Sequence, residues 1–439
     1  MKGWSKYWVL LTGICLMTCQ TDDSYKEKVT DPVYLDNTLS KLTDIIVYDI
    51  FSPPVASRIY AYASIAGYET LRHGHPDYPS LAGKVSELTE IPMAKSEDVN
   101  YNIAGVFAFA EMGKALIFSE PKMDEFLDDL KSRYTEAGVP RKVLEASIAY
   151  GLEAKAHIME WAKKDNYNET RTFPKFDIRE DPGRWQPTPP DYMEGIEPHW
   201  NVIRTLIIDS AQQFTPPVPT NYDMTEGSDF YKEVMEVYET GVNLDEERTG
   251  IAQFWDCNPY VSHHKGHVMF ATKKITPGGH WMGISQLAAR IDSADIMKTS
   301  KTFVYTSIAL FDAFISCWDE KYRSNLIRPE TVINRHIDEN WTPLLQTPPF
   351  PEYTSGHSVI SSAAAVALTS IYGDEFHFDD TVEMAYGLPM RSFNSFLEAS
   401  SEAAISRLYG GIHYMPAIAN GVAQGRKLGA FVVESLNEG

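Results

Sequence analysis

Cysteine, positive charge and long apolar segments are all scarce in this sequence of 439 residues. It has four cysteines, and its 39 lysines and arginines are outnumbered by 60 aspartates and glutamates, which leaves a net charge of -21. Nucleic acid and anionic lipid surfaces bind basic protein faces, so this excess of negative charge argues against both as main binding partners. Beyond residue 20 no apolar run is long enough to span a bilayer. We therefore expect a soluble mature body.

The first twenty residues have the pattern of an export signal. Lys2 and Lys6 precede a short apolar run that ends in "LMTC" at Cys19. This pattern resembles a bacterial lipoprotein signal over residues 1–19, in which Cys19 is lipidated; an ordinary secretory signal is the alternative. We expect an exported lipoprotein that is anchored to the outer membrane by lipid alone and faces the periplasm or the cell surface. After processing, Cys257 and Cys317 remain, and two buried thiols are the expected state.

Apolar residues recur at helical spacing, whereas strand-like alternation is scarce. Steps of three and four residues mark the segments 35–46, 59–69 and 144–161. The sequence therefore predicts a mostly α fold, a bundle of packed helices. Residues 166–224 are rich in proline, which interrupts helices, so we expect a connecting segment there. It would divide an N-terminal helical region (20–165) from a C-terminal helical domain (225–439).

The residues that suggest chemistry lie in the second half of the chain, in three short stretches. "KYRSNLIRPET" contains Lys321 and Arg328, which are cations in an otherwise acidic protein. "PFPEYTSGHSV" places Ser355, Gly356 and His357 at the start of an expected helix, where unpaired N–H groups and the helix dipole favour an anion. These two stretches together offer cations and hydrogen-bond donors to one oxyanion.

The third stretch, "ISRLYGGIHYMP", contains Arg407 at the end of one expected helix and His413 just before the next. Each stretch alone also has a simpler interpretation, since a Lys and an Arg seven positions apart often lie on one solvated face, and Ser-Gly-His often caps a helix. The order and spacing of the three stretches favour a common anion site.

Together the stretches have the form K-x6-R-P, then S-G-H, then S-R-x5-H. This pattern resembles the three-part motif of the type 2 phosphatidic acid phosphatase and vanadium haloperoxidase superfamily, with Thr354 in place of the usual proline. The stretches "FWDCNP", "GGHW" and "WQPTPP" extend the resemblance over roughly residues 175 to 435, and they are most similar to the soluble bacterial haloperoxidase branch.

The resemblance implies an α-helical bundle that holds vanadate as a cofactor or the phosphoryl group of a substrate. The resemblance assigns Lys321, Arg328 and Arg407 as the cations that neutralise the oxyanion, and Ser355 and Gly356 as hydrogen-bond donors to its oxygens. It assigns His413 as the apical histidine, which ligates vanadium or attacks phosphorus. His357 corresponds to the acid–base histidine. Phosphatases in particular often carry an aspartate four residues after the apical histidine, where this chain has Ala417. A backbone carbonyl or another side chain, such as Glu402, is then expected to orient His413.

Three functions remain open at this point. The first hypothesis is a vanadate-dependent haloperoxidase that oxidises halide with hydrogen peroxide. The alternative is a metal-free acid phosphatase that hydrolyses phosphoesters through a phosphohistidine at His413. The third is a non-catalytic lipoprotein that binds phosphate or vanadate. The missing carboxylate at Ala417 favours vanadate binding over phosphoryl transfer.

Two further clusters are less specific. One cluster consists of His263, His264 and His267, and it includes a pair at helical spacing that could ligate zinc. A polar lining above the anion site, or a position on the protein surface, fits these histidines better. The stretches "FWDCNP" and "GGHW" supply candidates for the pocket wall or, equally, for packing between helices: Trp255, Asp256, His280 and Trp281.

Overall fold

The computed structural model describes residues 23–265, 268–271 and 273–438, and it confirms the mostly helical fold. Cys19 and His267 lie outside the described residues. The N-terminal helices are α1 (Tyr25–Lys28), α2 (Val33–Tyr48), α3 (Pro53–Leu71), α4 (Tyr101–Lys114), α5 (Glu120–Glu136), α6 (Arg141–Ala162) and α7 (Tyr167–Thr170). The later helices are α8 (Asp229–Val242), α9 (Glu246–Phe254), α10 (Pro277–Ile291), α11 (Ile296–Ser324), α12 (Pro329–His336), α13 (Gly356–Tyr372), α14 (Phe396–Tyr409) and α15 (Met415–Asn437).

The apolar periodicity predicted the early helices correctly, since the segments 35–46, 59–69 and 144–161 lie within α2, α3 and α6. The proline-rich residues 166–224 contain little helix, namely α7 and the short 3-10 helix η2 (Trp200–Val202). The Asp312 carboxylate on α11 accepts hydrogen bonds from three consecutive backbone N–H groups of this segment, at Leu206, Ile207 and Ile208. The connecting segment is thus fastened to the core, because those donors would otherwise be buried without partners.

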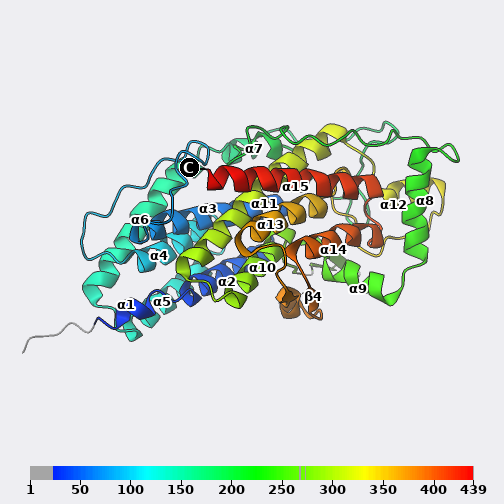
Figure 1. The fold of residues 1–439 in the computed structure, drawn as a ribbon. Helices are drawn as coiled ribbons and strands as arrows, with labels where there is room; N and C mark the ends of the chain where they lie inside the picture. The colour runs from blue at the N-terminus through cyan, green and yellow to red at the C-terminus, as the bar shows by residue number, and fades with distance from the viewer. Residues whose placement is uncertain (1–22, 266–267, 272, 439) are drawn as a thin grey trace, which may run out of the picture.

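Helix α11 is the central element of the bundle. Every residue from Thr302 to Lys321 is buried, as expected of a helix that is covered on all sides. Helix α3 from the N-terminal half packs against it, as do α10, α13 and α15 from the C-terminal half (Figure 1). One hydrophobic cluster includes residues of both halves. The boundaries of the two expected regions remain a prediction.

Helices α13 and α15 approach each other very closely, and this contact sets the geometry of the candidate site. A side-chain carbon added at Gly425 of α15 would lie 2.1 Å from the backbone oxygen of Val359 on α13. Only glycine allows this approach, because any larger residue would overlap with the backbone of the neighbouring helix. The start of α13 and the loop before α15 are consequently held side by side.

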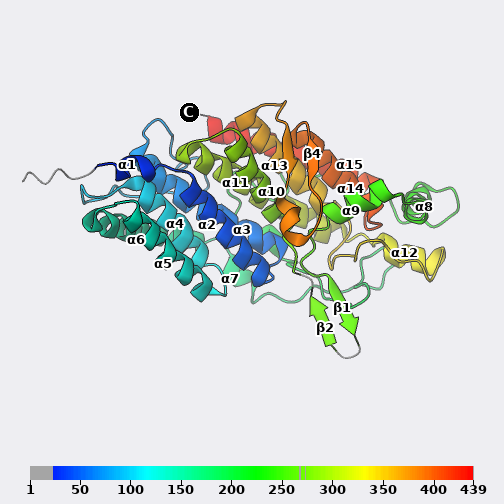
Figure 2. The ribbon, with the colours of Figure 1, turned by 90° about the horizontal axis from the view of Figure 1, so that it is seen from below.

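Strands are few and short. β1 (Ser262–Lys265) pairs with β2 (Val268–Ala271) in an antiparallel hairpin that projects from the helical body (Figure 2). β3 (Phe378–Asp380) pairs with β4 (Arg391–Phe393), and the 3-10 helix η3 (Val382–Tyr386) lies between them. His263 and His264 are consecutive residues of strand β1. Because His267 lies outside the described residues, the zinc-binding alternative for the histidine pair stays a prediction. In the described part of the chain, no helix combines the length and apolar character needed to cross a membrane.

Candidate active site

Residues of the second and third motif stretches converge on one inner cavity. Gly356 and His357 at the start of α13, Arg407 in the last turn of α14, and His413 in the loop before α15 line one inner cavity. Arg407 is 1% exposed and His413 is 3% exposed, so water screens these groups little. The close packing of α13 on α15 therefore brings together residues that are 57 positions apart in sequence, from Gly356 to His413.

Arg328 joins this site from the N-cap position of α12. Its Nε donates to the Phe350 carbonyl at 2.9 Å, and its Nη1 donates to the Ile412 carbonyl at 2.8 Å and lies 3.2 Å from His413 Nε2. Its Nη2 is buried and has no hydrogen-bond partner among the described residues. Because an unpaired buried guanidinium donor is costly, this atom is a strong candidate to contact a bound anion.

Lys321 lies behind the cavity rather than in its lining. Its Nζ donates to the carbonyls of Pro351, Glu352 and Thr354, at 3.1, 3.0 and 2.5 Å. Its stem lies beside Gly356, since a carbon added there would be 3.9 Å from Lys321 Cε. Burial is the main cause that lowers the pKa of Lys321 to about 8, and the nearby Arg328 charge acts in the same direction. Lys321 thus orders the loop before α13 and adds positive potential at the site.

Ser355 is the N-cap of α13, as its sequence position indicated. Its side-chain oxygen accepts from the backbone N–H of Ser358 at 3.3 Å and from the Ser358 hydroxyl at 2.8 Å. Its own hydroxyl proton is therefore left available to another acceptor. Ser406, beside Arg407, has its oxygen 3.0 Å from Arg407 Nε and helps to hold that guanidinium.

His413 is oriented by Glu352, a residue that the sequence analysis missed. Glu352 Oε1 lies 2.7 Å from His413 Nδ1 and also accepts from the backbone N–H of Tyr414 at 3.0 Å. Because a guanidinium can only donate, the contact with Arg328 makes His413 Nε2 an acceptor and places the ring proton on Nδ1. The Nε2 lone pair is the form that a metal ligand requires.

The suggestion that Glu402 orients His413 was wrong. Glu402 Oε1 instead accepts from Trp255 Nε1 at 3.0 Å, and its carboxylate forms an ion pair with Arg391. Glu352 could have been noticed as a lone acid in the proline- and aromatic-rich stretch "PFPEYTSGH". Its contact with His413 spans 61 positions, which sequence spacing does not predict.

Burial and the cationic surroundings set the charge of the site. Burial, with Arg328 and Lys321 adding to it, holds the pKa of His413 well below its usual value. Burial and the Arg407 charge do the same to the pKa of His357, whose Nε2 is buried without a partner among the described residues. Burial raises the pKa of Glu352 to about 7 against the pull of Arg328 and Lys321. Both histidines are thus neutral near pH 7 in a positively charged cavity.

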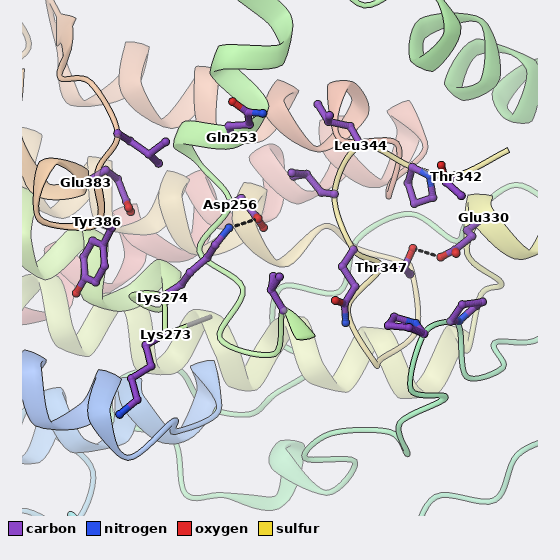
Figure 3. A pocket seen from close by; sticks show the side chains of 17 residues that line it. Gln253, Asp256, Lys273, Lys274, Glu330, Thr342, Leu344, Thr347, Glu383 and Tyr386 are labelled. Carbon is purple, nitrogen blue, oxygen red and sulfur yellow. Dashed lines mark hydrogen bonds and ion pairs between the residues drawn. The ribbon is translucent and has the colours of Figure 1, made fainter. Parts of the chain in front are cut away.

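A wider outer pocket of about 720 Å³ adjoins the inner cavity, since Asp256 lines both. Figure 3 shows Asp256 paired with Lys274 and, in another part of this pocket, Thr347 hydrogen-bonded to Glu330. Of the aromatic-motif candidates, Asp256 is thus a wall residue. Trp255, His280 and Trp281 are buried side chains that stack on one another behind this wall.

The fold and the site together define a helical-bundle protein with a buried, cationic cavity. A family model described as the VCPO second helical-bundle domain matches residues 301–438, the span that contains all three stretches. A crystal structure described as the first bacterial vanadium-dependent iodoperoxidase is 54% identical, with a TM-score of 0.88, and the match covers 93% of this chain and 97% of that one. The chain belongs to the vanadium-dependent haloperoxidase family.

Two more distant structures share the fold. The holo and apo forms of a bacterial vanadium-dependent chloroperoxidase are 18% and 17% identical to this chain, with TM-scores of 0.69 and 0.68. Each match covers 88% of this chain, and 93% and 94% of the respective structures. A comparison with curated protein sequences gave no match.

Proposed function

We propose that the protein oxidises iodide with hydrogen peroxide, using vanadate held between α13, α14 and the loop before α15. The family membership gives the haloperoxidase activity, and the 54% identical structure is described as an iodoperoxidase, which supports iodide as the halide. The single observation on this chain that carries the site assignment is the convergence of Arg407 and His413 on one inner cavity, with Arg328 in contact with His413.

The residues present fit a tetrahedral oxyanion such as vanadate. The unpaired Nη2 of Arg328 and Nε2 of His357 are polar atoms that lack protein partners within the described residues. His413 offers its Nε2 lone pair as the ligand, and Gly356 offers a backbone N–H in the first turn of a helix. Arg328 and Arg407, with Lys321 behind them, would neutralise the oxygens.

The chain's own groups have clear tasks in this reaction. Bound vanadate would supply the Lewis acidity that activates hydrogen peroxide towards attack by halide. His357 is neutral and its Nε2 is a buried atom without a partner among the described residues, so it can accept a proton from incoming peroxide and return it to the oxygen that leaves as water. Overall, halide, hydrogen peroxide and one proton give hypohalous acid and water. The Arg328 and Arg407 charges stabilise the anionic oxygens throughout.

The proposal is tested by assaying tag-free protein after removal of bound oxyanions, with and without added orthovanadate. We expect hydrogen peroxide-dependent oxidation of iodide only after vanadate addition, with bromide a poorer substrate. Hydrolysis of p-nitrophenyl phosphate, measured without vanadate, is expected to be weak. Strong phosphate hydrolysis together with no vanadate-dependent oxidation of any halide would instead identify an acid phosphatase.

We also propose that the mature chain is a lipoprotein that begins at Cys19 and is tethered to the outer membrane. The support is the "LMTC" sequence after a short apolar run, followed by the acidic "QTDD" as a solvated tether. Stable attachment requires more than one acyl chain. Mass spectrometry of the native N-terminus should therefore find a diacylated or triacylated Cys19. An unmodified N-terminus on protein released in soluble form would refute the anchor.

A further inference from the structure

A second cluster of ligating side chains lies behind the wall of the active site. Cys257 Sγ, His280 Nδ1 and Glu383 Oε1 all lie within 4.8 Å of one another, and all three residues are buried. They come from the loop after α9, from α10 and from η3. Neither the vanadate site nor the proposed reaction uses them.

From this arrangement we infer a binding site for a zinc-class divalent metal ion, with Cys257, His280 and Glu383 as its ligands. A thiolate, an imidazole and a carboxylate form a mixed sulfur, nitrogen and oxygen set that suits Zn²⁺ better than the oxygen-preferring Ca²⁺ or Mg²⁺. None of the three residues is assigned to the oxyanion above, although Cys257 also lines the inner cavity, and the inference does not depend on the identity of the halide.

The spacing of the three atoms matches a tetrahedral ion. Cys257 Sγ lies 3.5 Å from His280 Nδ1 and 3.5 Å from Glu383 Oε1, and His280 Nδ1 lies 3.0 Å from Glu383 Oε1. A zinc ion about 2.3 Å from sulfur and about 2.0–2.1 Å from nitrogen and oxygen would separate such ligands by roughly 3.3–3.6 Å. The cluster therefore needs only small movements to bind an ion.

The surroundings of His280 are those of a metal ligand. Its other ring nitrogen, Nε2, lies 2.7 Å from Asp380 Oδ2, and Asp380 is fully buried. When an ion replaces the proton on Nδ1, this carboxylate would hold the remaining ring proton on Nε2, so that Nδ1 can present its lone pair to the ion. The ring also stacks on Trp255 with a centroid distance of 4.7 Å, which holds its plane.

The ion would offset part of the local negative charge and has a path of entry. Asp380, Glu383 and a Cys257 thiolate would carry three negative charges around a neutral His280, and a divalent cation would neutralise two of them. Glu383 lines the outer pocket, where Figure 3 shows it beside Tyr386 and on the same side as Asp256 and Lys274. An ion can thus reach the cluster from the pocket that leads to the inner cavity.

A bound ion would stabilise the wall segment that holds Arg407 in place. Trp255 stacks on His280, and its backbone carbonyl accepts from Arg407 Nη2 at 3.0 Å. Cys257 follows Trp255 by two residues and lines the inner cavity. An ion held by Cys257 and His280 would therefore connect the segment at Trp255, which accepts the hydrogen bond from Arg407, to α10 and to η3.

Metal analysis and X-ray absorption on tag-free wild-type protein test the inference without any variant. After incubation with a zinc salt and dialysis, we expect about one zinc per chain, with one sulfur at about 2.3 Å and the other ligands at about 2.0–2.1 Å. Substoichiometric zinc after this treatment, or a coordination shell without sulfur, overturns the inference.

Variants locate the ion. Cys257→Ser and His280→Gln should each lower zinc affinity by tenfold or more, and Asp380→Asn by about tenfold through loss of ring orientation. Cys317→Ser is the matched control, because Cys317 is the other free, buried thiol among the described residues and lies on α11 outside the cluster; it should retain wild-type zinc. Circular dichroism establishes that each variant is folded before its metal is counted. Full zinc retention in folded Cys257→Ser would place the ion elsewhere and overturn the inference.

Discussion

In the Glu352→Ala variant, vanadate is expected to bind about 10- to 100-fold more weakly than in Glu352→Gln. Both substitutions remove the negative charge, so the charge effect on anion binding is the same in each. Glutamine still offers an oxygen to His413 Nδ1 and to the backbone N–H of Tyr414, whereas alanine leaves both donors buried and unpaired. The difference between the variants therefore isolates the hydrogen bond that orients His413.

Calorimetric titration with orthovanadate measures this difference. The same pair of substitutions at Glu402 serves as the control, because its partners are Trp255 and Arg391 rather than His413. Glu402→Ala and Glu402→Gln should bind vanadate equally well. Equal affinities for the two Glu352 variants would show that the carboxylate does not position the histidine.

Replacing Arg328 or Arg407 by alanine is expected to weaken vanadate binding by about 2 kcal/mol or more, roughly 30-fold. Both guanidinium groups are buried, and burial is the main cause that lowers the pKa of each. The pKa of Arg328 falls to about 10. An oxyanion that loses one of these partners keeps a buried charge without compensation.

Arg323 provides a control from the same stretch of sequence as Arg328. Its guanidinium is 40% exposed and pairs with Asp319 and Glu320 away from the cavity. Arg323→Ala should leave vanadate and phosphate affinity unchanged in the same titrations. If neither Arg328→Ala nor Arg407→Ala changes the affinity, the oxyanion site has been placed wrongly.

The sequence predicted the helices well because their apolar spacing records burial directly. The buried residues of α2 and α6 repeat every three to four positions, whereas α3 is buried on all sides. Ser355 marks the start of α13 through its capping side chain. The hairpin at His263 and His264 was missed because a short strand with polar residues has no comparable signal.

The parts of the site that sequence reasoning could not supply depend on tertiary packing. Glu352 reaches His413 across 61 positions, and the expected alternative, Glu402, faces Trp255. Likewise, Cys257 meets Glu383 across 126 positions, so the second cluster is invisible in the chain order. The motif marks Lys321 as a cation of the anion site. Only the structure shows that its Nζ donates to three loop carbonyls instead of lining the cavity.

The proposed function depends on vanadate binding to His413 in the inner cavity. The most direct test is a crystal structure of the vanadate-soaked protein with the anomalous signal of vanadium. We expect vanadium bonded to His413 Nε2, with oxygens in contact with Arg328 Nη2, Arg407 and the Gly356 N–H. Vanadium at another position, or in this cavity but bonded to a residue other than His413, would contradict it.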